Sequence, residues 1–326
     1  EDNLTLVEDF LAVSGTRAEL RKSMELALSK SFGATSGTPA TLTFDLAQGV
    51  TLSGGLTLQV ADVIINGEGK LADGFTFTPA SEDYTVSKEE NANIWHGQLV
   101  EANRVLQLTT PENKTYYFSS ANISDAFTTA AANPGSTLQL LQNISTTGRR
   151  PISRALTIDL NGHTWTLGSS SSYLAIPATG SVQLINTNED QEGVLAANES
   201  STVAVSIQGG SLSIGENVKV TGNTILLEEE PGGKLTVAGT IDTTGTANAP
   251  IMGNGSGKSD GTVITIQPGA KIIADATLGA AGIYHPQDGT LIINGGEISG
   301  DSGIYMKAGM LQMNGGKGTG SGPKEN

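Results

Sequence analysis

The chain has 326 residues, of which 37% are hydrophobic, with 42 glycines, no cysteine and a formal net charge of −15 at pH 7. A negative charge of this size repels phosphate backbones and anionic lipid headgroups, and no apolar run is long enough to span a membrane, which argues against nucleic acid and membrane insertion. The lack of cysteine excludes disulfide bonds and thiolate metal sites, and a glycine content about twice the usual ~7% is typical of short strands joined by many turns.

Residues 1–115 are predicted to form an N-terminal α+β region. The apolar residues Leu20, Met24 and Leu28 follow one another at helical spacing, which predicts a helix near residues 17–31. Strand-like runs come after it. The same order of helix, Gly/Pro break and strands begins again at residue 116, so the first region is interpreted as a diverged β-helix entry module.

Residues 116–326 are predicted to form a parallel β-helix, so the fold class is all-β. An amphipathic helix near residues 123–132 carries Ile123, Phe127 and Ala130 on one face. We expect this helix to cover the first coil, whose open backbone groups and apolar side chains are otherwise a hazard for aggregation.

The clearest repeat occupies residues 282–320, where GIYHPQDGTLIINGGEISG is followed by GIYMKAGMLQMNGGKGTG. Apolar and polar residues alternate in runs of three to five, the pattern of half-buried strands. Strands this short bury their apolar face only by stacking, with coils about 4.8 Å apart. Stacking places Leu212, Leu235, Leu291 and Leu311 in one inward file. An antiparallel sandwich is disfavoured, because it needs longer strands with regular hairpin signals.

One resemblance adds to this reading. The run YYFSSANISDAFTTAAANPGSTLQLLQNI with LTIDLNGHTWTL, within residues 116–167, resembles the first coils of right-handed β-helix surface proteins of bacteria, and the later units resemble their other coils. These proteins belong to the broad pectate-lyase-like superfamily. The resemblance implies a right-handed solenoid with an N-terminal capping helix, secreted or on a bacterial cell surface. It implies no single activity, because the superfamily includes lyases, hydrolases, adhesins and stalks.

No catalytic or metal-binding residue is assigned. Enzymes of the superfamily typically use carboxylates on adjacent coils, often with Ca²⁺, beside an arginine or lysine. Here the last arginine is Arg154, so the repeating body lacks the best bidentate partner for an anionic sugar. Calcium at turn aspartates remains an alternative to solvated turns. These aspartates are Asp260, Asp275, Asp288 and Asp301.

Other polar residues receive structural interpretations. Asp159 alternates with apolar neighbours and is expected to point outward or to join a corner hydrogen bond. Arg149, Arg150 and Arg154 are expected in a solvated loop, with anion binding as the alternative. His96 and His285 have no partner at a spacing that indicates a metal site.

A surface feature is predicted at Tyr284 and Tyr305, which occupy the same place in consecutive coils and would stack outward. They are the candidate ligand-binding residues, although an ordinary stacked pair that stiffens the coil is the preferred interpretation. The chain is expected to be a non-catalytic β-helix module, an adhesin, stalk or glycan-binding region, whose partners are host or cell-wall glycans or surface proteins. The alternative is a polysaccharide lyase or glycoside hydrolase with an atypical site. Glu1 and the polar tail at residues 315–326 suggest a piece of a longer protein.

Overall fold

The structure is a computed structural model. It describes residues 17–20, 25–198, 200, 203–228, 232–253, 261–285 and 288–321. The chain divides into two compact units, Glu1–Leu106 with Tyr116–Ala126, and Gln107–Thr115 with Phe127–Asn326. In the described ranges, no helix combines the length and the apolar character that crossing a membrane requires.

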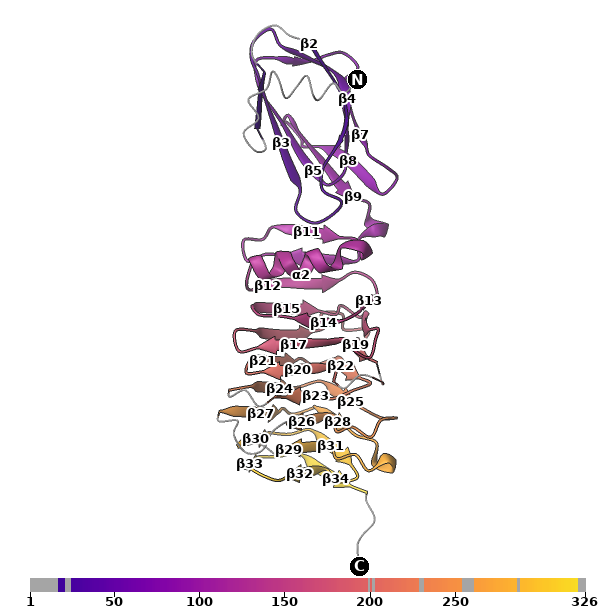
Figure 1. The fold of residues 1–326 in the computed structure, drawn as a ribbon, viewed down its shortest axis with the longest axis vertical. Coiled ribbons are helices and arrows are strands. Elements are labelled where there is room, and N and C mark those ends of the chain that lie inside the picture. Colours follow the sequence, from indigo (N-terminus) through magenta and orange to yellow (C-terminus); the bar gives the residue numbers. More distant parts are fainter. Residues whose placement is uncertain are drawn as a thin grey trace, which may run out of the picture. The chain divides into compact units, whose positions relative to one another are not determined.

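The second unit is a parallel β-solenoid, as predicted. From residue 136 onward, successive strands join three sheets in turn, and each strand pairs in parallel with the strand one turn further along the chain (Figure 1). One sheet has seven strands, one from each turn, so the described solenoid has seven complete three-strand turns before its last two strands. Each short strand finds backbone partners and a covered inner face only in neighbouring turns. The right-handed sense of the coil stays a prediction.

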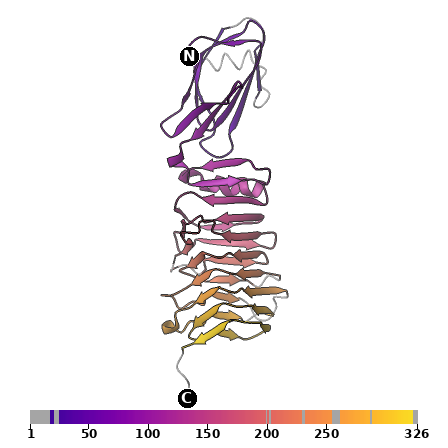
Figure 2. The same cartoon turned by 180° about the vertical axis from the view of Figure 1, so that it is seen from behind.

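In all three sheets the strands from residue 136 onward are stacked in chain order, and Figure 2 shows the stack from behind. The first consists of β11 (Thr115–Phe118), β10 (Leu106–Thr109), β12 (Ser136–Leu140), β15 (Ala155–Asp159), β18 (Ser181–Ile185), β21 (Ser211–Ile214), β24 (Lys234–Val237), β27 (Thr262–Ile266), β30 (Gly289–Ile293) and β33 (Met310–Met313). The second consists of β13 (Ile144–Thr146), β16 (Thr164–Leu167), β19 (Gly193–Ala197), β22 (Val218–Thr221), β25 (Thr240–Asp242), β28 (Lys271–Ile273), β31 (Glu297–Gly300) and β34 (Lys317–Gly320). The third consists of β14 (Arg149–Pro151), β17 (Tyr173–Pro177), β20 (Val205–Gln208), β23 (Ile225–Leu227), β26 (Ile251–Gly253), β29 (Ile283–His285) and β32 (Ile304–Met306).

The inward file expected from the alternation is present in the first sheet. Leu212 pairs in register with Leu235, Leu235 with Ile264, Ile264 with Leu291, and Leu291 with Leu311. The first four are at most 2% exposed, whereas Leu311 in the last described strand of the sheet is 42% exposed. The core of the unit is therefore continuous along the stack of turns.

The capping helix is confirmed as α2 (Ile123–Ala132). The ring of Phe127 packs against Trp165 in β16, with the ring centroids 5.4 Å apart, and Ala130 is buried beside it. Trp165 is fully buried and donates its indole N–H to the Thr146 hydroxyl at 2.9 Å. The second half of α2 therefore covers the apolar interior of the first turns.

The first unit also consists of stacked strands. One sheet has the order β1 (Arg17–Leu20), β3 (Ala40–Leu46), β5 (Ala61–Gly67), β9 (Ile94–Leu99) and β8 (Tyr84–Lys88). The other contains β2 (Glu25–Phe32), β4 (Thr51–Leu58), β6 (Lys70–Leu71) and β7 (Thr76–Pro79). The short 3₁₀ turns in the described part of the chain are η1 (Glu101–Asn103), η2 (Ser120–Asn122) and η3 (Ala276–Leu278).

Strands β1 to β5 alternate between these two sheets and pair in parallel within each. The chain therefore coils here as well, with two strands per turn instead of three. β9 pairs antiparallel with both β5 and β8, which ends the parallel stacking in this sheet. The buried core between the two sheets includes Phe44, Leu46, Leu52, Leu58 and Val63.

The helix expected near residues 17–31 is wrong, because that segment contributes β1 and β2, with residues 21–24 outside the described part. Leu26 and Leu28 also fit a period of two. Parallel pairing with β4 along the whole of β2 favours the strand over the local helical pattern. The expected α+β character is wrong for the described residues before 116, which hold strands and one 3₁₀ turn. Their origin as a diverged β-helix module stays a prediction.

Candidate functional site

The two surface tyrosines lie side by side in consecutive turns. Tyr284 in β29 pairs in register with Tyr305 in β32, and their rings are stacked with centroids 5.6 Å apart and an interplanar angle of 13°. Ile283, the residue before Tyr284, is fully buried. Since side chains alternate along a strand, the tyrosines face outward, as the sequence predicted. Ligand binding by this pair stays a prediction.

The tyrosines extend an apolar stripe on the outer surface of the third sheet. Leu226 in β23 pairs with Met252 in β26, and Met252 pairs with Tyr284. All are partly exposed, and Tyr305 is 48% exposed. Because neighbouring strands lie about 4.8 Å apart, these side chains form a narrow band across four turns. We call Leu226, Met252, Tyr284 and Tyr305 the outer stripe.

Lys307, in the residues just after β32, lies beside both tyrosine rings. Its Nζ is 5.6 Å from the ring centroid of Tyr284 and 5.9 Å from that of Tyr305. Because the two centroids are themselves 5.6 Å apart, the ammonium lies alongside the stack and not over one face. Its interaction with the Tyr284 hydroxyl raises the pKa of Lys307, and both phenols add an electrostatic contribution in the same direction. The two-residue spacing from Tyr305 was the available sequence signal for this neighbourhood.

The turn aspartates do not converge in the described residues. Asp275 accepts hydrogen bonds from the backbone of Thr277 and of Gly245, each at 3.0 Å. Bonds from the Thr277 hydroxyl and the Gly245 backbone lower the pKa of Asp275. Asp260 lies outside the described part. Within that part, no group of three His, Asp or Glu side chains could hold a metal ion, so neither Asp288 nor Asp301 belongs to such a group. Calcium binding stays a prediction without a site.

Asp159 joins the corner hydrogen bonds that were one of its two expected roles. Its side chain is 2% exposed and accepts from the Gln139 side chain at 2.7 Å and from the backbone of Asn161 at 3.0 Å. It also accepts from the backbone and hydroxyl of Thr187, at 3.0 and 2.6 Å. The carboxylate thus links three successive turns, and its role is structural.

The arginines of the first turns are engaged within the fold. Arg149 donates to the side-chain oxygen of Gln208 at 3.1 Å. The guanidinium of Arg150 lies 4.5 Å from the ring centroid of Phe127, and burial lowers the pKa of this side chain. A cavity of about 20 Å³ beside Arg154 has room for about one water molecule. The expected solvated loop is therefore wrong for Arg149 and Arg150, which lie in β14, with Arg149 exposed and Arg150 partly buried. Arg154 lies in an exposed bend, as expected. The cavity is too small for a sugar.

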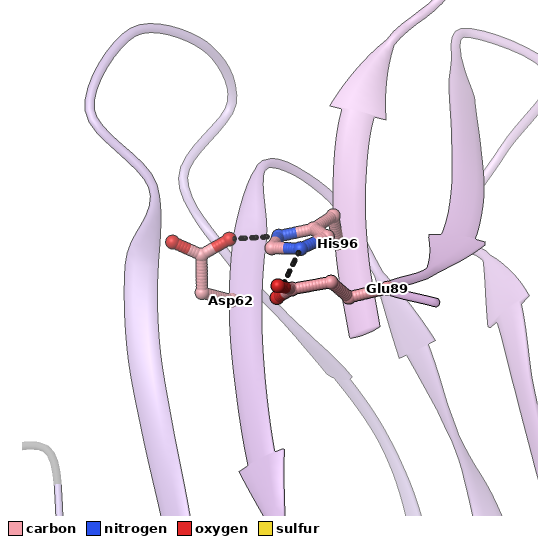
Figure 3. A network of polar contacts seen from close by, with 3 residues as sticks. All are labelled: Asp62, Glu89 and His96. Carbon is pink, nitrogen blue, oxygen red and sulfur yellow. Dashed lines mark hydrogen bonds and ion pairs between the residues drawn. The ribbon is translucent and has the colours of Figure 1, made fainter. Parts of the chain in front are cut away.

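A second polar cluster occupies the outer face of the first unit (Figure 3). His96 in β9 contacts Asp62 in β5 through Nδ1 at 2.7 Å, and its Nε2 lies 3.7 Å from a carboxylate oxygen of Glu89. Ser87 in β8 is opposite His96 in register, so Asp, His and Ser share one sheet face. In acyl-transfer sites Nε2 faces the serine, whereas here it faces Glu89. The side chains of His96, Asp62 and Glu89 are 30%, 34% and 51% exposed, so this is a solvent-exposed polar cluster.

His285 is the buried histidine of the solenoid. The residue is fully buried in β29, and its Nδ1 lies 3.2 Å from the backbone oxygen of Ala308. Burial lowers the pKa of His285, so the ring is neutral at physiological pH. It belongs to the core and does not contribute to the outer stripe.

Comparison with protein families, with curated proteins and with solved structures finds no match to this chain. The resemblance to the pectate-lyase-like superfamily and the bacterial origin that it implies therefore rest on the residues quoted for it alone. The structure establishes the fold class and no family: the chain is an all-β protein that forms a parallel β-solenoid, with one short helix, α2, in its described part.

Proposed function

We propose that the protein is a non-catalytic β-helix module, secreted or displayed on a bacterial surface, that acts as an adhesin or stalk and binds glycans along the outer stripe. Host or cell-wall glycans are its partners, with surface proteins as the second partner class. The observation that carries the proposal is the stacked pair Tyr284–Tyr305, which continues the partly exposed Leu226 and Met252 in register.

The chemistry of the stripe suits a sugar. Tyrosine offers an apolar ring and a polar hydroxyl together, and a sugar ring likewise combines apolar C–H groups with hydroxyls. Exposed apolar bands on a folded protein commonly mark interaction sites. The stripe lies on the outer face of its sheet, where the solenoid's own core does not use it.

The carboxylates favour binding over catalysis. A glycosidase needs two carboxyl groups roughly 5–10 Å apart across the scissile bond, in environments that set different protonation states. Asp159 and Asp275 instead hold corners together, and Asp62 pairs with His96. No described feature gives the lyase or hydrolase alternative comparable support.

The test is binding of the purified chain to immobilised glycans, compared with the double variant Tyr284→Ala/Tyr305→Ala. Two aromatic contacts at about 0.5–1.5 kcal/mol each correspond to a loss of affinity of roughly 5- to 150-fold. The control Tyr173→Ala removes a partly buried tyrosine from β17 in the same sheet and should bind as the wild type does. Glycan binding that the double variant retains, or release of unsaturated products or reducing ends from polysaccharides, would overturn the proposal.

A further inference from the structure

We infer that Lys307 and the hydroxyls of Tyr284 and Tyr305 form an anion-binding point on the outer stripe, and that the bound glycan carries a carboxylate or sulfate group. The inference rests on the proposed glycan binding and specifies the chemistry of the ligand.

The first argument is the position of the ammonium. Nζ of Lys307 is nearly equidistant from the two ring centroids, at 5.6 and 5.9 Å. An ammonium offers three N–H donors and no acceptor, and each phenol can donate one O–H. An oxyanion beside the stack can therefore accept charge-assisted hydrogen bonds, which are about twice as strong as neutral ones.

The second argument is the absence of a competing carboxylate among the described residues. Lys219 lies 2.9 Å from Asp242 and Lys114 lies 3.1 Å from Glu112, so these two ammonium groups have acidic partners. Lys307 has no carboxylate within ion-pair distance in the described part, and its contacts there are with the tyrosines. Its side chain is exposed. The positive charge is therefore available to a ligand.

The third argument is local charge. The chain carries −15 overall, but residues 283–321 carry −1, because three acidic residues oppose two lysines. One of those acids, Glu297, pairs in register with Lys317 in the next turn. Exposed charges more than about 8 Å away are largely screened at physiological ionic strength. The acidity of the rest of the chain therefore does not prevent an anion from binding here.

The chemistry also limits what is recognised. Lysine acts as a point charge and lacks the planar fork with which arginine holds a carboxylate at two points. A single anionic substituent fits this site, with its sugar ring against the exposed part of Tyr305, which is 48% exposed. The substituent is a uronic carboxylate or a sulfate ester.

Three hexasaccharides of equal length test the inference by calorimetry: chondroitin sulfate, chemically desulfated chondroitin and neutral maltohexaose. We expect binding to at least one acidic hexasaccharide, weakened at least tenfold by Lys307→Gln and by added NaCl. Lys317→Gln removes a lysine from β34 in the second sheet and should bind as the wild type does. Tyr284→Phe/Tyr305→Phe keeps the rings, removes the hydroxyls and should weaken binding severalfold. Binding that is lost on desulfation identifies the sulfate ester as the recognised anion, and binding that the desulfated form retains identifies the uronic carboxylate.

Two outcomes separate this inference from the proposed function. Equal binding of maltohexaose and the acidic sugars, unchanged in Lys307→Gln, overturns the anion-binding point and leaves glycan binding intact. If no glycan binds, the proposed function fails, and the anion-binding point is then tested with sodium glucuronate and inorganic sulfate. Shifts of the tyrosine ring signals in NMR spectra that disappear in Lys307→Gln support it, and spectra unchanged by both anions overturn it.

Discussion

The packing of the solenoid is tested most directly by Leu235→Ala. Leu235 is fully buried between Leu212 and Ile264 of the adjacent turns. The change removes about three methylene equivalents at ~0.8 kcal/mol each, or roughly 2.4 kcal/mol of transfer free energy. The remaining cavity raises the usual cost of Leu→Ala toward ~3–5 kcal/mol. Because turns contact only their neighbours, we expect the loss to concentrate in β21, β24 and β27.

Hydrogen exchange followed by mass spectrometry resolves this loss strand by strand, and urea denaturation followed by circular dichroism gives the global effect. The matched control is Leu311→Ala, the same change in the same file at a site that is 42% exposed. Partial exposure reduces the transfer term and leaves little enclosed cavity, so we expect a loss of about 1–1.5 kcal/mol. Equal costs at the two positions would refute the inward file as the core of the solenoid.

Two further outcomes concern buried polar groups. Asp159→Asn replaces the carboxylate by an amide that faces four hydrogen-bond donors, so we expect the free energy of unfolding in urea to fall by about 2–3 kcal/mol. The exposed control Asp190→Asn should change this free energy little. Equal effects of the two changes would contradict the buried role of Asp159. His285 has a lowered pKa in the fold, so the unfolded chain binds a proton more readily and stability should fall as pH drops below about 6.5. His285→Leu should reduce this pH dependence in urea titrations, and an unchanged slope in His285→Leu would contradict the assignment.

The second unit was predictable because its chemistry is local and repeated. In residues 282–320, short runs with apolar residues at every second position admit few ways to bury their inner faces, and stacking in register satisfies all of them together. The outward positions of Tyr284 and Tyr305 follow from the same alternation. Helix α2 was predictable because Ile123, Phe127 and Ala130 recur at helical spacing.

The fold of the first unit and the polar contacts of the candidate sites could not be predicted, because they depend on pairing between segments that are distant in the sequence. Leu20, Met24 and Leu28 fit a helix, yet the partner strand β4 determines that residues 25–32 are extended. The contact between Asp62 and His96 joins residues 34 positions apart through an antiparallel pairing that no short motif marks. Lys307 was closer to prediction, since its spacing from Tyr305 is two, but its distance to the ring of Tyr284 required the structure.

The spacing along the inward file has a consequence for how such a protein can change in size. Leu212, Leu235, Ile264, Leu291 and Leu311 are successive partners, separated by 23, 29, 27 and 20 residues, yet each sits one strand spacing from the next. Chain length is therefore absorbed at the corners, where inserted residues cost little. The length of the solenoid is set by its number of turns, at about 4.8 Å per turn. Corner loops can therefore be exchanged without changing that length.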